Sequence, residues 1–466
     1  MKRTIYILFF VIPLEIFSQQ NGLPKLDSWQ FVGQPGFSGS GGGVNYVSLA
    51  FNPIDGEPWV TFQDFGASSK ASVMKFDGTS WQNVGTRGFS NGVSYFENIA
   101  FTSTGQPYVA YKDDFYMAGN AVVRTFNGSN WIDVGTPGFS VLDAYSIKIA
   151  INSSNNVYVL YGDGANSGKA TVKTFNGTDW INVGTAGFTS YMIEGPYMAI
   201  NHSNNEIFIA YQDLSNNSKA NVMKFNGSSW VSVGTPNFSP DAASSLHLAI
   251  NPNTGMPWVT FSDGNNGYKA TVMKFDGSNW VNVGTSGFSN GIAVWDKIAF
   301  TSLGNAYVAF KDQPDINERA TVKTFNGTDW IDVGAEDFTP GKAEYLSLSF
   351  GPGDVPYLAM EDFGNWGEAS VMKYGPSSGI EENALSVLPL SPNPASSEIN
   401  IDFSGFNCNE RRLELFDLIG NKIFEDKSSD NKYTLCIANY IDGVYYLSVK
   451  TDKSCYIAKF IKISNR

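Results

Sequence analysis

Residues 276–288 read Asp-Gly-Ser-Asn-Trp-Val-Asn-Val-Gly-Thr-Ser-Gly-Phe, and a closely related stretch returns about every fifty residues along the chain. In this copy Trp280 is followed by Gly284 four residues later and by Phe288 eight residues later. The tryptophans of the seven copies are Trp29, Trp81, Trp131, Trp180, Trp230, Trp280 and Trp330. A period this regular indicates a repeat architecture, and about fifty residues is the size of one four-stranded propeller blade.

Each repeat contains four short segments rich in β-branched and aromatic residues. In one unit they are residues 248–250, 257–261, 270–275 and 280–283, separated by Gly, Asn, Asp and Pro. The Asp-Gly pair at 276–277 predicts a tight hairpin, because both central residues of that turn need positive φ. No segment has the apolar period of a helix. The sequence therefore predicts an all-β fold, a seven-bladed β-propeller.

The two ends of the repeat array complement each other. Residues 28–32 form a Trp segment with no unit before it, whereas the last unit runs through residues 371–374 and lacks its Trp segment. We expect the N-terminal strand to complete the last blade, because closing the ring hides sheet edges that would otherwise aggregate. The alternative, an open solenoid, needs capping repeats, and the sequence contains none that we recognise.

An Asp two residues after an aromatic residue is a second marker of the repeat. In the last copy Met360 replaces the aromatic residue. The seven aspartates are Asp64, Asp113, Asp163, Asp213, Asp263, Asp312 and Asp362. They could form a ring that binds cations or sugar hydroxyls, or each could bond backbone N–H groups of its own loop. A residue present in every blade more often serves the blade itself, so the second interpretation is favoured.

The loops after the Trp segments and after the aspartates should emerge on one face of the ring. Residues 140–144, 189–195 and 289–295 differ from copy to copy, and variable loops on a fixed scaffold are where binding residues usually lie. The aromatic binding candidates on this face are Tyr116, Tyr191, Tyr268, Trp295 and Trp366. The repeated Trp and Phe residues, in contrast, are expected to pack between blades.

The repeats give little support for catalysis. The only histidines, His202 and His247, are near neither a Ser/Asp pattern nor a metal-ligand spacing. The loop carboxylates that could act as glycosidase acids are Asp143, Glu194, Asp241 and Glu318. Sequence places no two of them at the separation that such a reaction needs. We therefore expect a protein that is not an enzyme and that has no cofactor and no metal.

The charge of the chain is negative and belongs to the repeats. The net charge is −13, of which residues 377–466 carry −2 and residues 1–18 carry +1, so residues 19–376 carry −12. A protein that follows nucleic-acid phosphates needs a basic face, so nucleic acid is excluded as a partner.

The first eighteen residues have the pattern of a secretory signal peptide. Lys2 and Arg3 precede an apolar run at residues 5–13, and Ser18 is a small residue at the expected cleavage point. The apolar run is shorter than the roughly 20 residues that a membrane span needs, and no other stretch is long enough. We expect export and a mature chain without a transmembrane segment.

The composition changes after the last repeat, where residues 376–390 read as a linker. Residues 391–466 then contain Pro-Asn-Pro at 392–394, Leu-Glu-Leu-Phe-Asp at 413–417 and Gly-Val-Tyr-Tyr-Leu at 443–447. Alternating apolar residues predict a small β-sandwich. This segment resembles the type A C-terminal sorting domain of the type IX secretion system of Bacteroidetes. The residues that match the sorting signal are Pro392, Asn393, Pro394, Gly420, Gly443, Val444, Tyr445, Lys459 and Lys462.

The resemblance implies the type IX secretion machinery as a partner, and a place outside the cell or on its surface. The alternative for this segment is a generic β accessory domain such as a carbohydrate-binding module. All three cysteines, Cys408, Cys436 and Cys455, lie in it, and their pairing stays open.

These observations divide the chain into a signal peptide (1–18), a propeller (27–375), a linker (376–390) and a sorting domain (391–466). We expect a secreted or surface-attached binding protein whose variable-loop face takes a glycan or a surface protein. Two alternatives stay open: a glycan-cleaving propeller enzyme, either hydrolase or lyase, and a structural surface component. The sequence does not identify the ligand or the oligomeric state.

Overall fold

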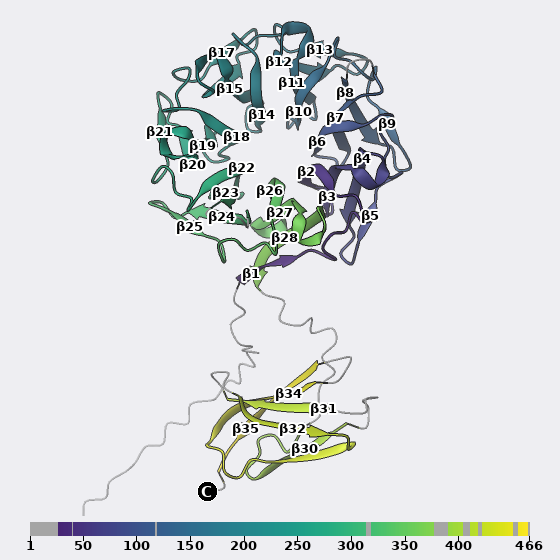
Figure 1. Ribbon diagram of the computed structural model, residues 1–466, viewed down its shortest axis with the longest axis vertical. Helices are drawn as coiled ribbons and strands as arrows, with labels where there is room; N and C mark the ends of the chain where they lie inside the picture. The colour runs from purple at the N-terminus through teal and green to yellow at the C-terminus, as the bar shows by residue number, and fades with distance from the viewer. Residues whose placement is uncertain are drawn as a thin grey trace, which may run out of the picture. The chain divides into compact units, whose positions relative to one another are not determined.

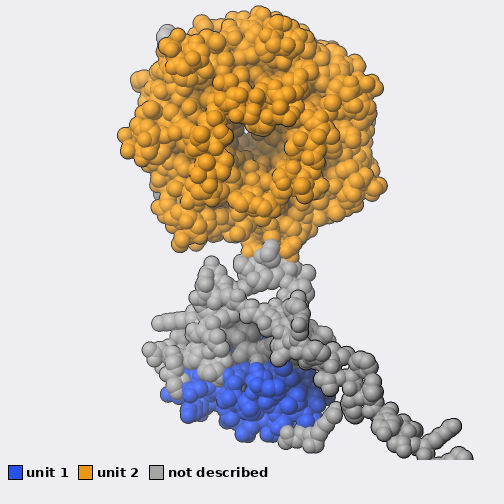
Figure 2. All heavy atoms as spheres, turned by 180° about the vertical axis from the view of Figure 1, so that it is seen from behind, with its two compact units in different colours: residues 1–25, 378–466 blue, residues 26–377 orange. Residues whose placement is uncertain are grey.

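The computed structural model describes residues 27–39, 41–116, 119–313, 318–376, 390–403, 411–417, 422–450 and 455–464. The predicted signal peptide and nearly all of the predicted linker lie outside these ranges. The chain divides into two compact units (Figure 2), Leu26–Ser377 and a second one made of Met1–Lys25 with Ser378–Arg466. Within the described ranges, no helix has both the length and the apolar character to cross a membrane.

In the larger unit, the described residues form seven antiparallel sheets of four strands each, arranged around a central opening (Figure 1). The innermost strands contact one another from sheet to sheet, and β26 contacts β2 to complete the circle. These inner strands are β2 (Val44–Phe51), β6 (Ser94–Phe101), β10 (Ala144–Ile151), β14 (Ile193–Asn201), β18 (Ala243–Ile250), β22 (Ile292–Phe300) and β26 (Ala343–Gly351). The all-β prediction is confirmed, and the repeated sheets are consistent with propeller blades.

Two further strands of each sheet lie outward from the inner strand. The second strands are β3 (Pro58–Asp64), β7 (Pro107–Asp113), β11 (Val157–Asp163), β15 (Glu206–Asp213), β19 (Pro257–Asp263), β23 (Ala306–Gln313) and β27 (Val355–Asp362). The third strands are β4 (Lys70–Phe76), β8 (Asn120–Phe126), β12 (Lys169–Phe175), β16 (Lys219–Phe225), β20 (Lys269–Phe275), β24 (Ala320–Phe325) and β28 (Glu368–Pro376). Short 3-10 turns join several of these pairs: η1 (Phe65–Ala67), η2 (Gly164–Asn166), η3 (Leu214–Asn216), η4 (Gly264–Asn266) and η6 (Phe363–Asn365), while η5 (Pro352–Asp354) precedes β27.

The outermost strands carry the repeated tryptophans. They are β5 (Trp81–Asn83), β9 (Trp131–Asp133), β13 (Trp180–Asn182), β17 (Trp230–Ser232), β21 (Trp280–Asn282), β25 (Trp330–Asp332) and β1 (Asp27–Phe31). β1 pairs antiparallel with β28, with Trp29 opposite Tyr374. The N-terminal strand therefore supplies the outer strand of the last sheet, as the ends of the repeat array predict.

The tryptophans link each sheet to the sheet before it. The side-chain N–H of each of the seven repeated tryptophans donates to a valine carbonyl of the preceding sheet, and Trp29 completes the series by donating to the Val333 carbonyl at 2.7 Å. Each indole also stacks on the repeated Phe of that sheet, with ring centroids 4.0 to 5.0 Å apart. The expected packing role of these residues is confirmed.

The packing of the tryptophans between sheets also explains the repeated glycine. Gly284 has a φ of +70°, and an added Cβ would lie 3.2 Å from Cδ1 of Trp330 in the next sheet. Glycine adopts this backbone conformation without steric cost and leaves room for the indole.

The C-terminal unit has two sheets that share one hydrophobic core. One sheet has the order β29 (Leu390–Ser391), β30 (Glu398–Asp402), β33 (Lys432–Cys436). The other has the order β32 (Lys422–Ser428), β31 (Arg411–Phe416), β34 (Gly443–Lys450), β35 (Cys455–Lys462). Ile399 and Leu435 from the first sheet join Leu413 and Leu447 from the second in the core.

Candidate functional site

The repeated aspartates are buried, with at most 4% of any of them exposed. Asp263 is typical: its carboxylate accepts from the backbone N–H of Asn265 (3.0 Å), from Asn266 Nδ2 (2.7 Å) and from Thr271 Oγ1 (3.2 Å). Because all three donors lie in the same loop or the strand after it, this carboxylate holds the loop in shape.

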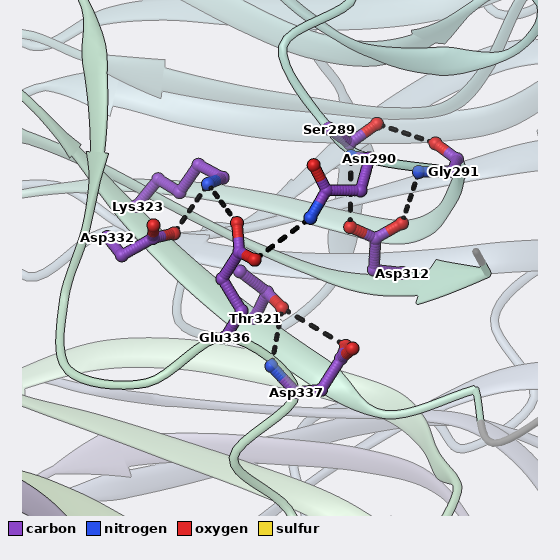
Figure 3. A network of polar contacts seen from close by, with 9 residues as sticks. All are labelled: Ser289, Asn290, Gly291, Asp312, Thr321, Lys323, Asp332, Glu336 and Asp337. Atoms are coloured by element: carbon purple, nitrogen blue, oxygen red, sulfur yellow. Dashed lines mark hydrogen bonds and ion pairs between the residues drawn. The ribbon is translucent and has the colours of Figure 1, made fainter. Parts of the chain in front are cut away.

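Two further arrangements occur at the same position. The Asp312 carboxylate accepts from the backbone N–H groups of Asn290 (3.1 Å) and Gly291 (2.7 Å), so it holds the loop before β22 (Figure 3). The Asp64 carboxylate instead receives two bonds from the Arg87 guanidinium, at 2.6 and 2.8 Å. In all three arrangements, the carboxylate oxygens accept hydrogen bonds from donors of the protein itself.

The five aromatic candidates do not come together. Trp366 is 92% exposed, and Tyr191 and Tyr268 are also exposed on loops. Tyr116 is half-buried, and its hydroxyl accepts from Asn91 Nδ2 at 2.7 Å. Trp295, predicted in a loop at 289–295, lies instead on inner strand β22, which begins at Ile292. The ends of the loops predicted at 140–144 and 189–195 likewise belong to inner strands, which begin at Ala144 and Ile193.

A cavity of about 480 Å³ lies among the seven inner strands, and each strand contributes to its lining. The space-filling view shows the opening at the centre of the ring (Figure 2). Trp295 lines this cavity, whereas the other four aromatic candidates do not. We call it the central channel.

Every inner strand is interrupted by a bulge near its start, three residues in on β22 and two residues in on the others, and the bulge residue lines the channel. On β2, for example, the register shifts between Asn45 and Ser48. The bulge residues, all with φ between +48° and +62°, are Tyr46, Phe96, Ser146, Gly195, Ser245, Trp295 and Tyr345. Because Val44 pairs with Asp64, the bulges lie at the end of the sheets where the aspartate loops emerge. We call that side the loop face.

The bulge residues divide the channel into two halves. Four neighbouring sheets contribute the aromatic rings of Trp295, Tyr345, Tyr46 and Phe96, with consecutive centroids 4.5, 5.1 and 5.0 Å apart. We call these four residues the aromatic arc. The other three sheets contribute two serines and a glycine at this position, and on that side Lys148, Glu194 and Tyr197 also line the cavity.

Ionisable groups also line the channel or lie directly behind it. Burial raises the pKa of Glu97 to about 8, and the Ser94 hydroxyl hydrogen bond opposes this. Burial lowers the pKa of Lys148 to about 8 and that of Lys297 to about 7. Burial likewise raises the pKa of Asp296 to about 7. Perturbed groups gathered in a cavity are typical of functional sites.

Sequence reasoning identified Trp295 but missed the rest of the arc. The signal was present, because Tyr46, Phe96, Trp295 and Tyr345 recur at the fifty-residue spacing of the repeat. Such a position varies between copies inside a strand that is otherwise repeated. Because this position lies within a strand, it is not among the variable loops that usually indicate a binding face.

The sorting-signal residues lie in the C-terminal unit. The Asn393 side chain accepts from the backbone N–H of Ile461 at 3.0 Å, between Pro392 and Pro394, which both follow cis peptide bonds. Tyr445 is buried, and its hydroxyl donates to the Ile441 carbonyl at 2.8 Å.

Four of the remaining sorting-signal residues lie on the last two strands of the unit. Gly443 begins β34, where Val444 follows it, and Lys459 lies on β35. Lys462 is buried, with its ammonium 3.6 Å from Asp442. Gly420 lies outside the described residues. So does Cys408; among the described residues Cys436 is a free, exposed thiol.

No group of three or more His, Cys, Asp or Glu side chains within the described ranges is arranged to hold a metal ion. No curated protein matches the chain.

Several solved structures are similar to the chain. PorZ, a surface component of the type IX secretion system of Porphyromonas gingivalis, is 14% identical with a TM-score of 0.45 over 89% of this chain, which spans 59% of the PorZ chain. The lectin SapL1, solved with α-methyl fucoside, is 16% identical with a TM-score of 0.42, over 65% of this chain and 99% of that one. An ulvan lyase is 10% identical with a TM-score of 0.45, over 74% and 95%.

The C-terminal unit has a family match of its own. Residues 390–463 match the family described as the secretion system C-terminal sorting domain. The chain therefore carries a type IX secretion sorting domain, and the protein is secreted or attached to the cell surface.

Proposed function

We propose that the larger unit is a seven-bladed β-propeller, closed by its N-terminal strand, that works outside the cell as a glycan-binding module. The circle of Trp-to-Val hydrogen bonds supports the closure, since Trp29 bonds to the sheet before its own. The sorting domain supports the location.

The aromatic arc is the observation that carries the proposal. A non-glycine residue at positive φ is strained, and such strain gathers where it serves a function. Gly195 fills the same bulge without a side chain, so the fold itself does not require bulky rings there. Aromatic rings that face a cavity of about 480 Å³ suit the apolar faces of sugar rings.

The concave shape favours a glycan over a flat protein surface. Small-molecule sites are concave, and this cavity combines aromatic rings with polar and charged side chains that can bond to sugar hydroxyls.

Glycan cleavage is the second candidate, and Glu97 favours it. A carboxyl that keeps its proton near pH 7 inside a cavity can serve as a general acid. Under this alternative, Glu97→Gln would abolish turnover and leave binding in place.

The test is retention of the full chain on a panel of bacterial, algal and plant polysaccharides, with released reducing ends measured in the same wells. Retention without release is expected. Release that Glu97→Gln removes would overturn the binding module in favour of the enzyme. Absence of both would contradict glycan binding altogether and favour a structural or protein-binding role.

A further inference from the structure

Two lysines share the central channel. Lys148 on β10 and Lys297 on β22 both line the cavity and are half-buried. Burial lowers the pKa of Lys297 and of His247, the charge of Lys148 lowers both further, and the charge of Lys297 also lowers the pKa of His247.

Neither ammonium is paired with a carboxylate among the described residues. Lys148 Nζ lies 5.5 Å above the Tyr197 ring and has no hydrogen bond or ion pair in those ranges. Lys297 Nζ donates to the backbone carbonyls of Trp295 (3.4 Å) and Asp296 (3.1 Å). The Asp296 carboxyl does not pair with it and accepts instead from Ser262 Oγ at 3.0 Å.

Two lysines of the same unit that are more deeply buried, with at most 5% of each exposed, are paired with carboxylates. Lys311 contacts the carboxylates of Glu318 (2.8 Å) and Glu344 (3.2 Å). Lys323 likewise has two carboxylate partners. Enclosing a charge without a partner is unfavourable, so enclosed lysines are normally paired. Lys148 and Lys297 are exceptions, because they have no carboxylate partner among the described residues. This is more unusual because residues 19–376 carry a net charge of −12, so carboxylates are plentiful in the unit.

We propose that the channel binds an anionic end group of a glycan, a carboxylate or a sulfate, through Lys148 and Lys297 while the adjoining sugar ring stacks on the aromatic arc. An anion there would be attracted by two ammonium groups that have no carboxylate partner among the described residues, and in a partly buried site this attraction is stronger than in bulk water. This inference rests on the proposed glycan binding and specifies its ligand class.

The test uses the full chain and calorimetric titration at low ionic strength. The carboxylate arm compares tetragalacturonic acid with its methyl ester, and the sulfate arm compares a dextran sulfate oligosaccharide with dextran. We expect one acidic probe to bind at least about tenfold more tightly than its neutral counterpart, since each close charge pair contributes on this scale. The arm that responds identifies the anion.

Substitutions of the two lysines test whether they cause the preference for the acidic probe. Lys148→Met and Lys297→Met keep the apolar stem and remove the charge, and each should reduce affinity for the acidic probe about tenfold with little change for the neutral one. Lys373→Met, an exposed lysine on β28, is the matched control and should have no effect.

The possible results of these titrations distinguish a failure of the anion site from a failure of glycan binding itself. Equal binding of acidic and neutral probes, or unchanged affinity in both variants, would overturn the anion site and leave glycan binding standing. Absence of binding by every probe would overturn both. The comparison of acid and ester needs no variant, so a variant that fails to fold does not rescue the proposal.

Discussion

Trp295 and Tyr345 hold the same bulge position on neighbouring sheets, and their rings lie with centroids 4.5 Å apart and planes 40° apart. Their φ angles are +61° and +48°. Two bulky side chains are thus kept in a backbone conformation that favours glycine, facing a cavity. This pair begins the aromatic arc that continues through Tyr46 to Phe96.

The repeated aspartates should matter for stability and not for the ligand. Asp263→Asn replaces one accepting oxygen by an amide nitrogen, which cannot accept from the Asn266 or Thr271 side chain. We expect the free energy of unfolding to fall by about 1–3 kcal/mol, with unchanged affinity for any retained glycan. Denaturant unfolding and retention measure the two effects. Asp179→Asn, at an exposed hairpin turn, is the control, and lost retention in folded Asp263→Asn would contradict this role.

Ring closure should be most sensitive at Trp29. Trp29→Ala removes the stack on Phe338 and the bond to Val333, and we expect it to lower stability by about 3–5 kcal/mol, as for Trp180→Ala in a sheet of consecutive strands. Only Trp29→Ala should also release β1 and expose the edge of β28, which invites self-association.

Hydrogen exchange distinguishes the two variants. The amides of β28 that pair with β1 should exchange faster in Trp29→Ala than in Trp180→Ala, and the protein should associate at high concentration. Equal exchange in both variants would mean that β1 does not depend on this contact.

The affinity of an acidic glycan should fall as the pH rises above about 6. Lys297 and Lys148, with pKa values of about 7 and about 8, lose their charge over this range. Asp296 and Glu97, with pKa values of about 7 and about 8, become negative over the same range. His247 stays neutral, because burial keeps its pKa well below the ordinary value. All four changes disfavour an anion.

Titration with tetragalacturonic acid at several pH values measures this dependence. A bound anion stabilises the charged lysines and moves the midpoint upward. Glu194, exposed at the cavity rim, adds only a solvated charge, and binding of the methyl ester should be flat. An acid affinity that is constant or rises with pH contradicts the lysine site.

Glu97 should make the fold less stable at alkaline pH. The folded protein keeps the proton up to a pKa of about 8, whereas the unfolded chain loses it near 4.5. Since the folded state then binds more protons, the stability contributed by this group is present below pH 4.5 and is lost as the pH rises to about 8. The slope is about 1.4 kcal/mol per pH unit.

Glu97→Gln removes this dependence. Its free energy of unfolding should therefore exceed that of the unchanged protein by an amount that grows from pH 5 to pH 8. Denaturant unfolding across this range measures the difference. A constant difference would show that Glu97 ionises normally in the folded state.

The repeated sheets and the pairing of β1 with β28 could be predicted, because they rest on local signals that repeat along the chain. The Asp-Gly pairs predict hairpins, and the Trp–Phe spacing predicts a repeated sheet. The Trp segment that comes before the first full repeat can be accommodated only as the missing strand of the last sheet. For the aspartates, the sequence allows a ligand-binding ring or a role within each loop, and only the loop contacts, such as those of Asp312, support the second. The channel could not be predicted, because a bulge shifts each inner strand by one residue and turns Tyr46 and its counterparts toward the axis. Lys148 and Lys297 lie 149 residues apart in the sequence, and only the closed ring brings them together.

The most direct measurement compares Trp295→Gly with Trp366→Ala for one polysaccharide that the full chain retains. Gly195 already occupies the equivalent bulge, so Trp295→Gly should keep the fold while removing one ring of the arc. We expect Trp295→Gly to lose at least about tenfold in affinity, since stacking of a sugar on one ring contributes on this scale, and Trp366→Ala to change the affinity by less than about twofold. Unchanged affinity in folded Trp295→Gly together with a loss in Trp366→Ala would contradict the channel and place the ligand on the loops.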